Sequence, residues 1–360
     1  MTIAAPLTAT AQDGPHVAVV IPAFRAAASI ADVIAGIPPF VRTIVVVDDH
    51  SPDDTARVVR ELGDTRVHLV RHEQNGGVGA ATMTGYREAA RLGATILVKM
   101  DADGQMDPAA LPALIAPILR GLADYTKGNR FLHARELRAM PLLRRVGNLG
   151  LSFMTKLASG YWRVFDPTNG FTALHATAFA MLDPRRIGTR YFFETSMLLE
   201  LGLHRAVVRD VAVPARYGDE QSHLSEWRSL AGFPPRQLRG FLRRVWTQHF
   251  VRDFGLMAVF LTSGTGALLF GLLFGAGTWI HSARTGHAAT TGTVMLSVLP
   301  IIVGVQLLLQ AMLLDVQSEP QTALHAEARD EARAFEAFRA AGAPERAAMP
   351  RRREGQERVG

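Results

Sequence analysis

Two long segments without a charged residue constrain this 360-residue chain more than any other feature. Residues 255–280 form a run of 26 such positions, and residues 293–314 form a run of 22. As helices these runs would extend about 39 and 33 Å, at roughly 1.5 Å per residue. About 20 apolar residues are enough to cross the hydrocarbon core of a bilayer. The sequence therefore predicts a multi-pass membrane protein with two transmembrane helices within residues 254–315.

The distribution of arginine predicts how these helices are oriented. Residues 227–252 contain six arginines and no acidic residue, residues 351–353 add three more, and the connection 281–292 contains one. Lys and Arg accumulate on the cytoplasmic side of membranes, so we expect the N-terminal part and the C-terminal tail in the cytoplasm. Within 226–253 the apolar residues share a helical face that the arginines avoid, which predicts a basic amphipathic helix lying on the bilayer surface.

The overall charge narrows the possible partners only slightly. The formal net charge of +6 fits lipid headgroups and diphosphates, and it also fits nucleic acid. No nucleic-acid recognition motif accompanies the arginines, so we expect no nucleic-acid partner. The chain has no cysteine, which excludes disulfides and thiolate metal sites.

Residues 16–225 have the pattern of an α/β domain. Buried strands are expected at 17–21, 43–47, 67–70 and 94–100, and later at 125–130 and 207–213. Helices are expected between them, at 26–37, after a cap at Ser51, and at 80–92, 109–119 and 141–160. This alternation predicts a mostly parallel, doubly wound sheet. Residues 1–15 lack the pattern of a signal peptide, and we expect them to be disordered.

Polar motifs follow the expected carboxyl ends of three strands, at 48–49, 75–77 and 101–105. Ligands of open α/β sheets bind at that edge. The carboxylates of Asp101 and Asp103 and the amide oxygen of Gln105 are hard ligands, suited to a Mg²⁺ or Mn²⁺ that grips a diphosphate. An acidic surface turn is the alternative, since Asp is common in turns and helix caps. Asp107 is expected to cap the helix that Pro108 begins.

Four motifs occur together in a characteristic order. They are Ile21-Pro-Ala-Phe24, Val46-Val-Asp-Asp-His-Ser-Pro-Asp-Asp-Thr55, Asn75-Gly-Gly-Val-Gly-Ala-Ala81 and Asp101-Ala-Asp-Gly-Gln105. Over residues 16–225 the chain resembles a family 2 glycosyltransferase of the GT-A fold. It is most similar to the polyprenyl-phosphate group that includes dolichol-phosphate mannose synthases. The resemblance implies a metal-dependent, inverting transfer of a sugar from a nucleotide-diphosphate sugar to a polyprenyl phosphate. Arg25-Ala26 replaces the family's usual Asn-Glu, which leaves the donor sugar and base open.

The resemblance also implies roles for individual residues. The nucleotide-sugar would contact Pro22, Ala23, Asp48, Asp49, Asn75, Gly76, Gly77 and Asp101. The cation would be bound by Asp101, Asp103 and Gln105. The acceptor would contact Arg130, Asn169, Glu194, Arg216 and Ser222. The residues that would act in catalysis are Asp103, Asp166, Arg130 and Arg216. Because a lipid phosphate is already ionised at neutral pH, no strong general base would be needed.

Two other functions stay open from the sequence. A family 2 transferase acting on a hydroxyl of a glycolipid or polysaccharide would need a carboxylate base. A non-catalytic membrane scaffold would be favoured by degraded metal ligands, whereas those in 101–105 are intact. The tail 316–360 is expected to be helical around 323–341 and disordered beyond, with no function assigned. The oligomeric state is open as well.

Overall fold

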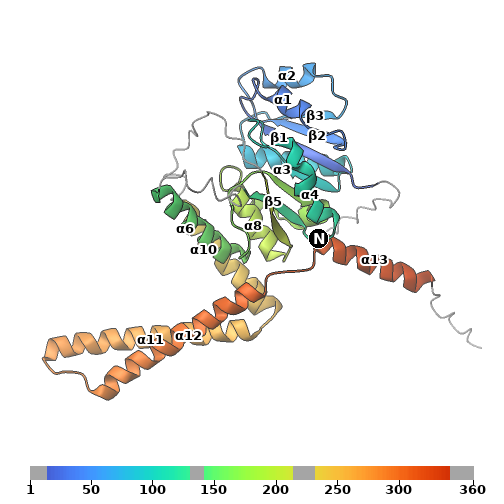
Figure 1. Cartoon of the computed structure of the whole chain (residues 1–360). Coiled ribbons are helices and arrows are strands. Elements are labelled where there is room, and N and C mark those ends of the chain that lie inside the picture. Colours follow the sequence, from blue (N-terminus) through green and yellow to red (C-terminus); the bar gives the residue numbers. More distant parts are fainter. Residues whose placement is uncertain (1–13, 130–141, 214–231, 341–360) are drawn as a thin grey trace, which may run out of the picture.

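The computed structural model describes residues 14–129, 142–213 and 232–340 (Figure 1). Three predicted site residues, Arg130, Arg216 and Ser222, lie outside these ranges. So do most of the N-terminal segment and the tail beyond residue 340, for which disorder was predicted. The domain boundaries given above therefore stay predictions.

The centre of the molecule is a seven-stranded sheet with the strand order β3-β2-β1-β4-β6-β5-β7. The strands are β1 Val17–Ala23, β2 Thr43–Asp48, β3 Val67–Arg71, β4 Ile96–Lys99, β5 Tyr125–Asn129, β6 Thr172–His175 and β7 Val208–Ala212. All are parallel except β6, which runs antiparallel between β4 and β5. The prediction of a mostly parallel α/β fold is confirmed. β6 was not predicted.

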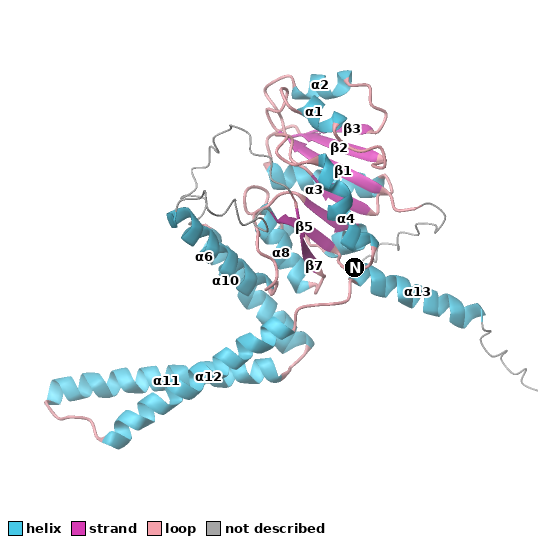
Figure 2. Ribbon diagram, viewed as in Figure 1, coloured by secondary structure: helices cyan, strands magenta, loops and turns pink. Residues whose placement is uncertain are grey.

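Helices cover both faces of this sheet (Figure 2). In chain order they are α1 Ile30–Ala35, α2 Thr55–Glu61, α3 Val78–Arg91, α4 Leu111–Leu119, α6 Leu142–Ser159, α7 Ala176–Met181, α8 Phe193–Leu203 and α10 Phe233–Val245. Successive residues of β1 point to opposite faces: Val19 and Ile21 pack with α1 and α4, whereas Ala18 and Val20 pack with α3 and α8. Because both faces are buried, the central strands are continuously apolar.

Two helix starts test the capping predictions. The Asp107 carboxylate accepts a hydrogen bond from the Ala109 amide at 3.0 Å and caps a 3-10 turn that leads into α4. That prediction is confirmed. The prediction for Ser51 is wrong, because α2 begins only at Thr55. The Ser51 hydroxyl instead accepts a hydrogen bond from the Arg25 amide, at 3.1 Å, and so holds the loop after β1.

Helices α6 and α10 bury several polar side chains against the domain and expose several apolar ones. Gln237 is buried and donates a hydrogen bond to Thr155 at 2.8 Å. The exposed residues Phe153, Leu238 and Leu242, and Trp246 directly after α10, are 47, 53, 57 and 62% exposed. A helix that covers the core of a soluble protein has the opposite arrangement.

Helices α11 Leu256–Thr285 and α12 Thr291–Gln317 form a hairpin that extends from the α/β domain (Figure 1). Both are long and apolar enough to cross a membrane, and only 22 and 11% of their most apolar windows are buried. A core helix of a soluble protein would be mostly buried. The two helices pack closely where glycines permit it, since a Cβ at Gly304 would lie 2.6 Å from the Leu268 amide nitrogen.

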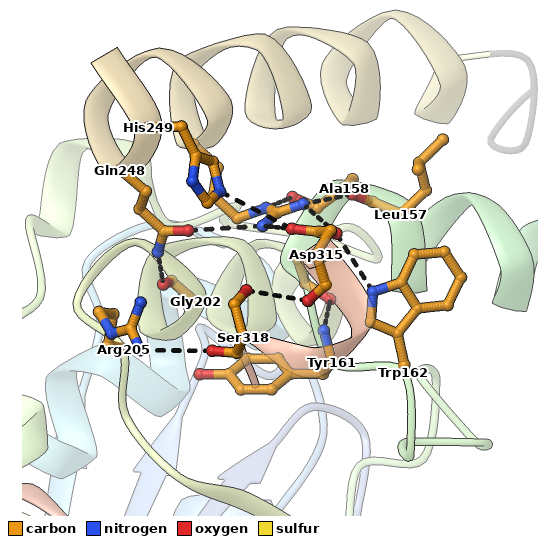
Figure 3. Close-up of polar contacts among 12 residues, drawn as sticks. Leu157, Ala158, Tyr161, Trp162, Gly202, Arg205, Gln248, His249, Asp315 and Ser318 are labelled. Atoms are coloured by element: carbon orange, nitrogen blue, oxygen red, sulfur yellow. Dashed lines mark hydrogen bonds and ion pairs between the residues drawn. The ribbon is translucent and has the colours of Figure 1, made fainter. Parts of the chain in front are cut away.

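The hairpin is joined to the domain by a buried ion pair (Figure 3). The Arg244 guanidinium contacts both oxygens of Asp315, near the end of α12, at 2.7 and 3.0 Å. The indole of Trp162 donates to the same carboxylate at 3.1 Å. Arg244 also donates to the carbonyls of Leu157 and Ala158, at the end of α6.

The last helix, α13 Leu324–Ala340, begins against the domain at the sheet edge where β5 starts. The Asp124 carboxylate accepts hydrogen bonds from the amides of Leu324 and His325, and it contacts His325 Nδ1 at 2.8 Å. The His325 ring stacks on His175 with their centroids 4.1 Å apart. Burial, together with the neighbouring His325, lowers the pKa of His175 to about 4.

Candidate active site

The turn that follows β4 holds the acidic motif in a defined conformation. Gly104 has a φ of +76°, which favours glycine. The Asp103 carboxylate accepts a hydrogen bond from the Gln105 amide at 2.9 Å. The Ser29 hydroxyl donates to the Ala102 carbonyl at 2.6 Å and so ties the turn to the start of α1. The side chains of Asp103 and Gln105 lie on the exposed side of the turn.

A buried lysine connects this turn to another part of the chain. Lys99, the last residue of β4, is only 1% exposed. Its Nζ lies 2.7 Å from Asp101 Oδ1 and 3.3 Å from Glu194 Oε1, in the first turn of α8. Burial alone would lower the pKa of Lys99, but the two carboxylates outweigh it and raise the pKa above its usual value. Lys99 is therefore charged and holds Asp101 close to Glu194.

The loop between α6 and β6 packs directly on this pair. Lys99 also donates to the Gly170 carbonyl at 3.4 Å. A Cβ on Gly170 would lie 2.5 Å from Lys99 Nζ and 2.9 Å from Asp101 Oδ2. In the same loop Asp166 is buried and accepts a hydrogen bond from Thr168 at 3.3 Å. Asn169 is turned back onto the chain, because its Oδ1 accepts from the Phe171 amide.

A second buried lysine, Lys127, holds the same loop by a hydrogen bond. Lys127 of β5 aligns with Thr172 of β6, which in turn aligns with Lys99 of β4. The Lys127 ammonium donates to the Asn169 carbonyl. Burial lowers the pKa of Lys127 to about 8, opposed by the charges of Asp166 and Glu194. Lys127 can thus lose its proton at mildly alkaline pH.

Asp210 on β7 fixes where the loop begins. Its Oδ2 accepts hydrogen bonds from the Asn129 side chain at 2.7 Å and from the Phe165 amide at 2.8 Å. Burial raises the pKa of Asp210. The end of β5 is thereby joined to the start of the loop at Phe165, beside Asp166, and Asn129 is the residue that precedes Arg130.

The two carboxylates after β2 have different surroundings. Asp49 holds the glycine turn, since its oxygens accept from the amides of Gly76 and Gly77 at 2.8 and 2.7 Å. Its Oδ1 also contacts His72 Nδ1 at 2.7 Å. Asp48 is fully buried; it accepts from the Ser51 amide and pairs with Arg71 at 3.2 Å.

The remaining nucleotide candidates lie beside these carboxylates. Pro22 and Ala23 end β1, and the Ala23 carbonyl accepts a hydrogen bond from the Asp49 amide at 2.9 Å. The Asn75 side chain donates to the Asp49 carbonyl at 3.2 Å. Gly77 has a φ of +90°, and a Cβ there would lie 2.6 Å from the Thr189 carbonyl oxygen. The glycines of this turn thus permit close packing of the segment around Thr189; their contact with a nucleotide stays a prediction.

The predicted site residues that the structure describes therefore cluster at the carboxyl ends of β1, β2 and β4 and in the loops that face them. Direct contacts join Asp101 to Glu194 through Lys99, and Asp49 to the glycine turn. Sequence reasoning missed Lys99, Lys127 and Asp210. A lysine inside a strand that is otherwise apolar was the available signal for the first, because an unpaired charge is not buried.

The mostly parallel α/β sheet, with the Asp101–Gln105 turn at the carboxyl end of β4, is the arrangement on which the comparisons with known proteins bear. A family model described as glycosyl transferase family 2 matches residues 18–182. An uncharacterised protein of Methanocaldococcus jannaschii is 32% identical over 200 residues, covering 55% of this chain and 81% of that protein. The chain belongs to glycosyl transferase family 2.

Several relatives have named activities, and two of them illustrate the range. A UDP-N-acetylglucosamine–dolichyl-phosphate N-acetylglucosaminyltransferase of Methanococcus voltae is 39% identical over 162 residues, covering 41% of this chain and 64% of that protein. A dolichol-phosphate mannosyltransferase of Pyrococcus furiosus is 30% identical over 177 residues, covering 49% of this chain and 47% of that protein. The chain thus spans less than two thirds of either relative.

Proposed function

We propose that this protein transfers a sugar from a nucleotide-diphosphate sugar to a polyprenyl phosphate at a membrane. The proposal rests mainly on one observation. The same chain contains both the acidic site and exposed apolar helix surfaces that are suited to contact with a bilayer. The site lies on the domain from which α6, α10 and the turn after α10 expose Phe153, Leu238, Leu242 and Trp246. The two relatives described above, which by their names act on dolichyl phosphate, support the same acceptor class.

Membrane attachment follows from the same surfaces. Helices α11 and α12 would span the bilayer, while α6 and α10 would lie in its interface with their apolar side chains in contact with lipid. The arginines of 227–252 and 351–353 favour a cytoplasmic location for the domain and tail. An acceptor that cannot leave the bilayer would thereby meet the site without diffusing through water.

The acidic turn fits a divalent cation that is shared with the substrate. Within the described part of the chain, no group of three His, Asp or Glu side chains is arranged to hold a metal alone. Asp101, Asp103 and Gln105 would supply oxygen ligands, and the diphosphate and water the others, as is common for Mg²⁺. The cation would neutralise the charge that develops on the departing nucleoside diphosphate.

The chain's own residues would orient the reactants. Lys99 would keep the Asp101 carboxylate in place, and Glu194 would face the sugar or acceptor from α8. Asp166 and Asn169 would border the reacting centre, with Asn169 held by Lys127. Arg130 and Arg216 would bind the acceptor phosphate, for which a guanidinium fork is well suited. The ionised phosphate oxygen would attack the sugar carbon directly and invert its configuration.

The test is a transfer assay with purified full-length protein in lipid. Labelled UDP- and GDP-sugars are offered together with polyprenyl phosphate, with Mg²⁺, with Mn²⁺ or with EDTA. We expect label in the lipid phosphate from one donor, dependent on a divalent cation and abolished by Asp103→Ala. The exposed Arg60→Gln on α2 is the matched control and should retain activity.

Two results would overturn the proposal. Transfer from these donors to a glycolipid hydroxyl, with none to the lipid phosphate, would assign the chain to the other acceptor class. Full activity of Asp103→Ala would contradict the assignment of Asp103 as a ligand of a required cation. The topology is tested separately: protease added on the outer side of inverted and right-side-out vesicles should cleave the domain only in the inverted ones.

A further inference from the structure

A large basic cavity lies between α8 and α10, outside the acidic site. Its volume is about 710 Å³, and the segment 185–192 forms a further wall. Seven arginines line it, among them Arg190 from that segment and Arg236, Arg239 and Arg243 from α10. Glu200 of α8 is the one acidic residue among the lining side chains. Such a density of guanidinium groups requires anions nearby to offset their repulsion.

The neighbouring carboxylates offset only part of this charge. Glu200 pairs with Arg186 and Arg243 at 3.4 Å. Asp183, beside the cavity, pairs with Arg185 and Arg186. Asp315 pairs with Arg244, which also lines the cavity. The three carboxylates thus pair with four of the seven arginines.

Three of the arginines form no ion pair within the described ranges 14–129, 142–213 and 232–340. They are Arg190, Arg236 and Arg239, and all three are exposed. The cavity therefore has cationic groups available to an added anion.

The cavity also has an apolar side that a simple inorganic anion would not use. Tyr191, Phe192, Leu199 and Phe233 contribute to its wall. The Arg236 guanidinium lies 5.5 Å from the centre of the Phe192 ring. A ligand that combines a phosphate with a glycerol and acyl portion would contact both kinds of surface.

The position of the cavity relative to the hairpin favours such a ligand. Arg244, which lines the cavity, is bound to Asp315 near the end of α12. The opposite face of α10 exposes Leu238 and Leu242. If α12 spans the bilayer, the cavity opens at the level of the lipid headgroups.

We propose that this arginine cavity binds the phosphate of an anionic phospholipid headgroup. Paired guanidinium groups match phosphate oxygens in geometry and charge, and basic groups near a membrane surface attract anionic lipids. The proposal rests on the membrane association proposed above, but it does not depend on sugar transfer. The bound lipid would join α8 to α10 at the base of the membrane hairpin.

The test measures lipid-dependent stabilisation of the delipidated full-length protein in detergent. Short-chain phosphatidylglycerol is titrated while the Tm is recorded, in parallel with phosphatidylcholine of the same chain length, inorganic phosphate and pyrophosphate. We expect a saturable rise in Tm with phosphatidylglycerol alone. The double variant Arg190→Gln/Arg239→Gln should need at least ten times more phosphatidylglycerol for half of the effect. Because neither arginine forms an ion pair in the described chain, its lipid-free Tm should stay near that of the wild type.

Two further double variants make the result decisive. Arg60→Gln/Arg87→Gln removes the same charge from exposed positions on α2 and α3 and should respond as the wild type does. Arg190→Lys/Arg239→Lys retains the charge and should recover most of the response.

An unchanged phosphatidylglycerol titration in the Gln variant would overturn the proposal. An equal shift with phosphatidylcholine would overturn the requirement for an anionic headgroup, and an equal shift with phosphate or pyrophosphate would assign the cavity to a soluble anion. Because no transfer is measured, these outcomes are independent of the transfer assay.

Discussion

The Arg244 guanidinium and the Asp315 carboxylate form a nearly fully buried ion pair between two elements that belong to different parts of the molecule. Both side chains are 3% exposed, and the two are 71 positions apart in the chain. One belongs to the helix on the surface of the domain, and the other to the last turns of the apolar hairpin. The orientation of the hairpin relative to the domain is thus set by a charge–charge contact shielded from water (Figure 3).

Removing one partner of this pair should destabilise the whole chain. In Arg244→Met the Asp315 carboxylate stays buried without its cationic partner, which typically costs about 3–5 kcal/mol. The measurement is thermal unfolding of the purified protein in detergent. Arg163→Met is the control, because its guanidinium is 77% exposed and lies 3.6 Å from Glu319; exposed pairs contribute at most about 1 kcal/mol. Equal losses in both variants would contradict the assigned role.

Lys99→Met should weaken the binding of the proposed catalytic cation. Asp101 loses the ammonium that orients it, and loss of such an outer partner typically lowers metal affinity or activity by about 10–100-fold. The measurement is the concentration of Mn²⁺ or Mg²⁺ that gives half-maximal transfer. The exposed Arg87→Met, on the outer side of α3, should leave that concentration unchanged. A Lys99→Met enzyme with a lower maximal rate but unaltered cation dependence would argue against this positioning role.

Gly170→Ala tests the close approach of the loop to the acidic turn. The added Cβ would lie 2.5 Å from Lys99 Nζ and 2.9 Å from Asp101 Oδ2, so the Lys99–Asp101 pair must shift. We expect a loss of at least about tenfold in the transfer rate, since a displacement of about 1 Å can cost 10²-fold. Gly150→Ala in α6 is the matched control, as its Cβ meets nothing within 4 Å. It should retain activity and gain up to about 1 kcal/mol in stability. Comparable activity in the two variants would refute the steric argument.

The contribution of Lys127 to the free energy of unfolding should increase as the pH rises in the alkaline range. Burial lowers its pKa to about 8 in the folded protein from an ordinary value of 10.5. Between these values the unfolded chain binds the proton more strongly, so the folded state gains stability as the pH rises. Lys127→Met lacks this gain. The difference in Tm between wild type and variant should therefore shift in favour of the wild type between pH 8 and 10. A difference that is constant over that range would show that the Lys127 pKa is not depressed.

Parts of the fold could be predicted from the sequence where the local residue pattern matches the environment that those residues have in the folded protein. The apolar runs of β1, β2 and β4 are buried on both faces, as their composition indicates, and Asp107 caps the helix that Pro108 begins. β6 could not be predicted, because its four residues become a strand only by pairing with β4 and β5, which are distant in the chain.

The polar core of the site was missed for a related reason. A lysine in a strand is stable inside the protein only if a partner meets it there, and Glu194 lies 95 positions after Lys99 in the chain. The orientation of α10 was likewise not fixed by its periodicity. Both an apolar and a basic face were visible in the sequence, but the residues that pack inward are Phe233, Gln237, Arg244 and Val245.

The contact of Asp124 with Leu324 and His325 has a consequence for the biosynthesis of the protein. Asp124 directly precedes β5, whereas its partners are translated 200 and 201 positions later. At about 5–20 residues per second, the ribosome needs on the order of tens of seconds to reach them. During that interval the nascent domain lacks two of the amides that bind this carboxylate, and the two apolar helices emerge first. These contacts at the sheet edge would thus form only after the hairpin has been synthesised. A chain that ends before residue 324 should therefore lack them and fold incompletely at this edge.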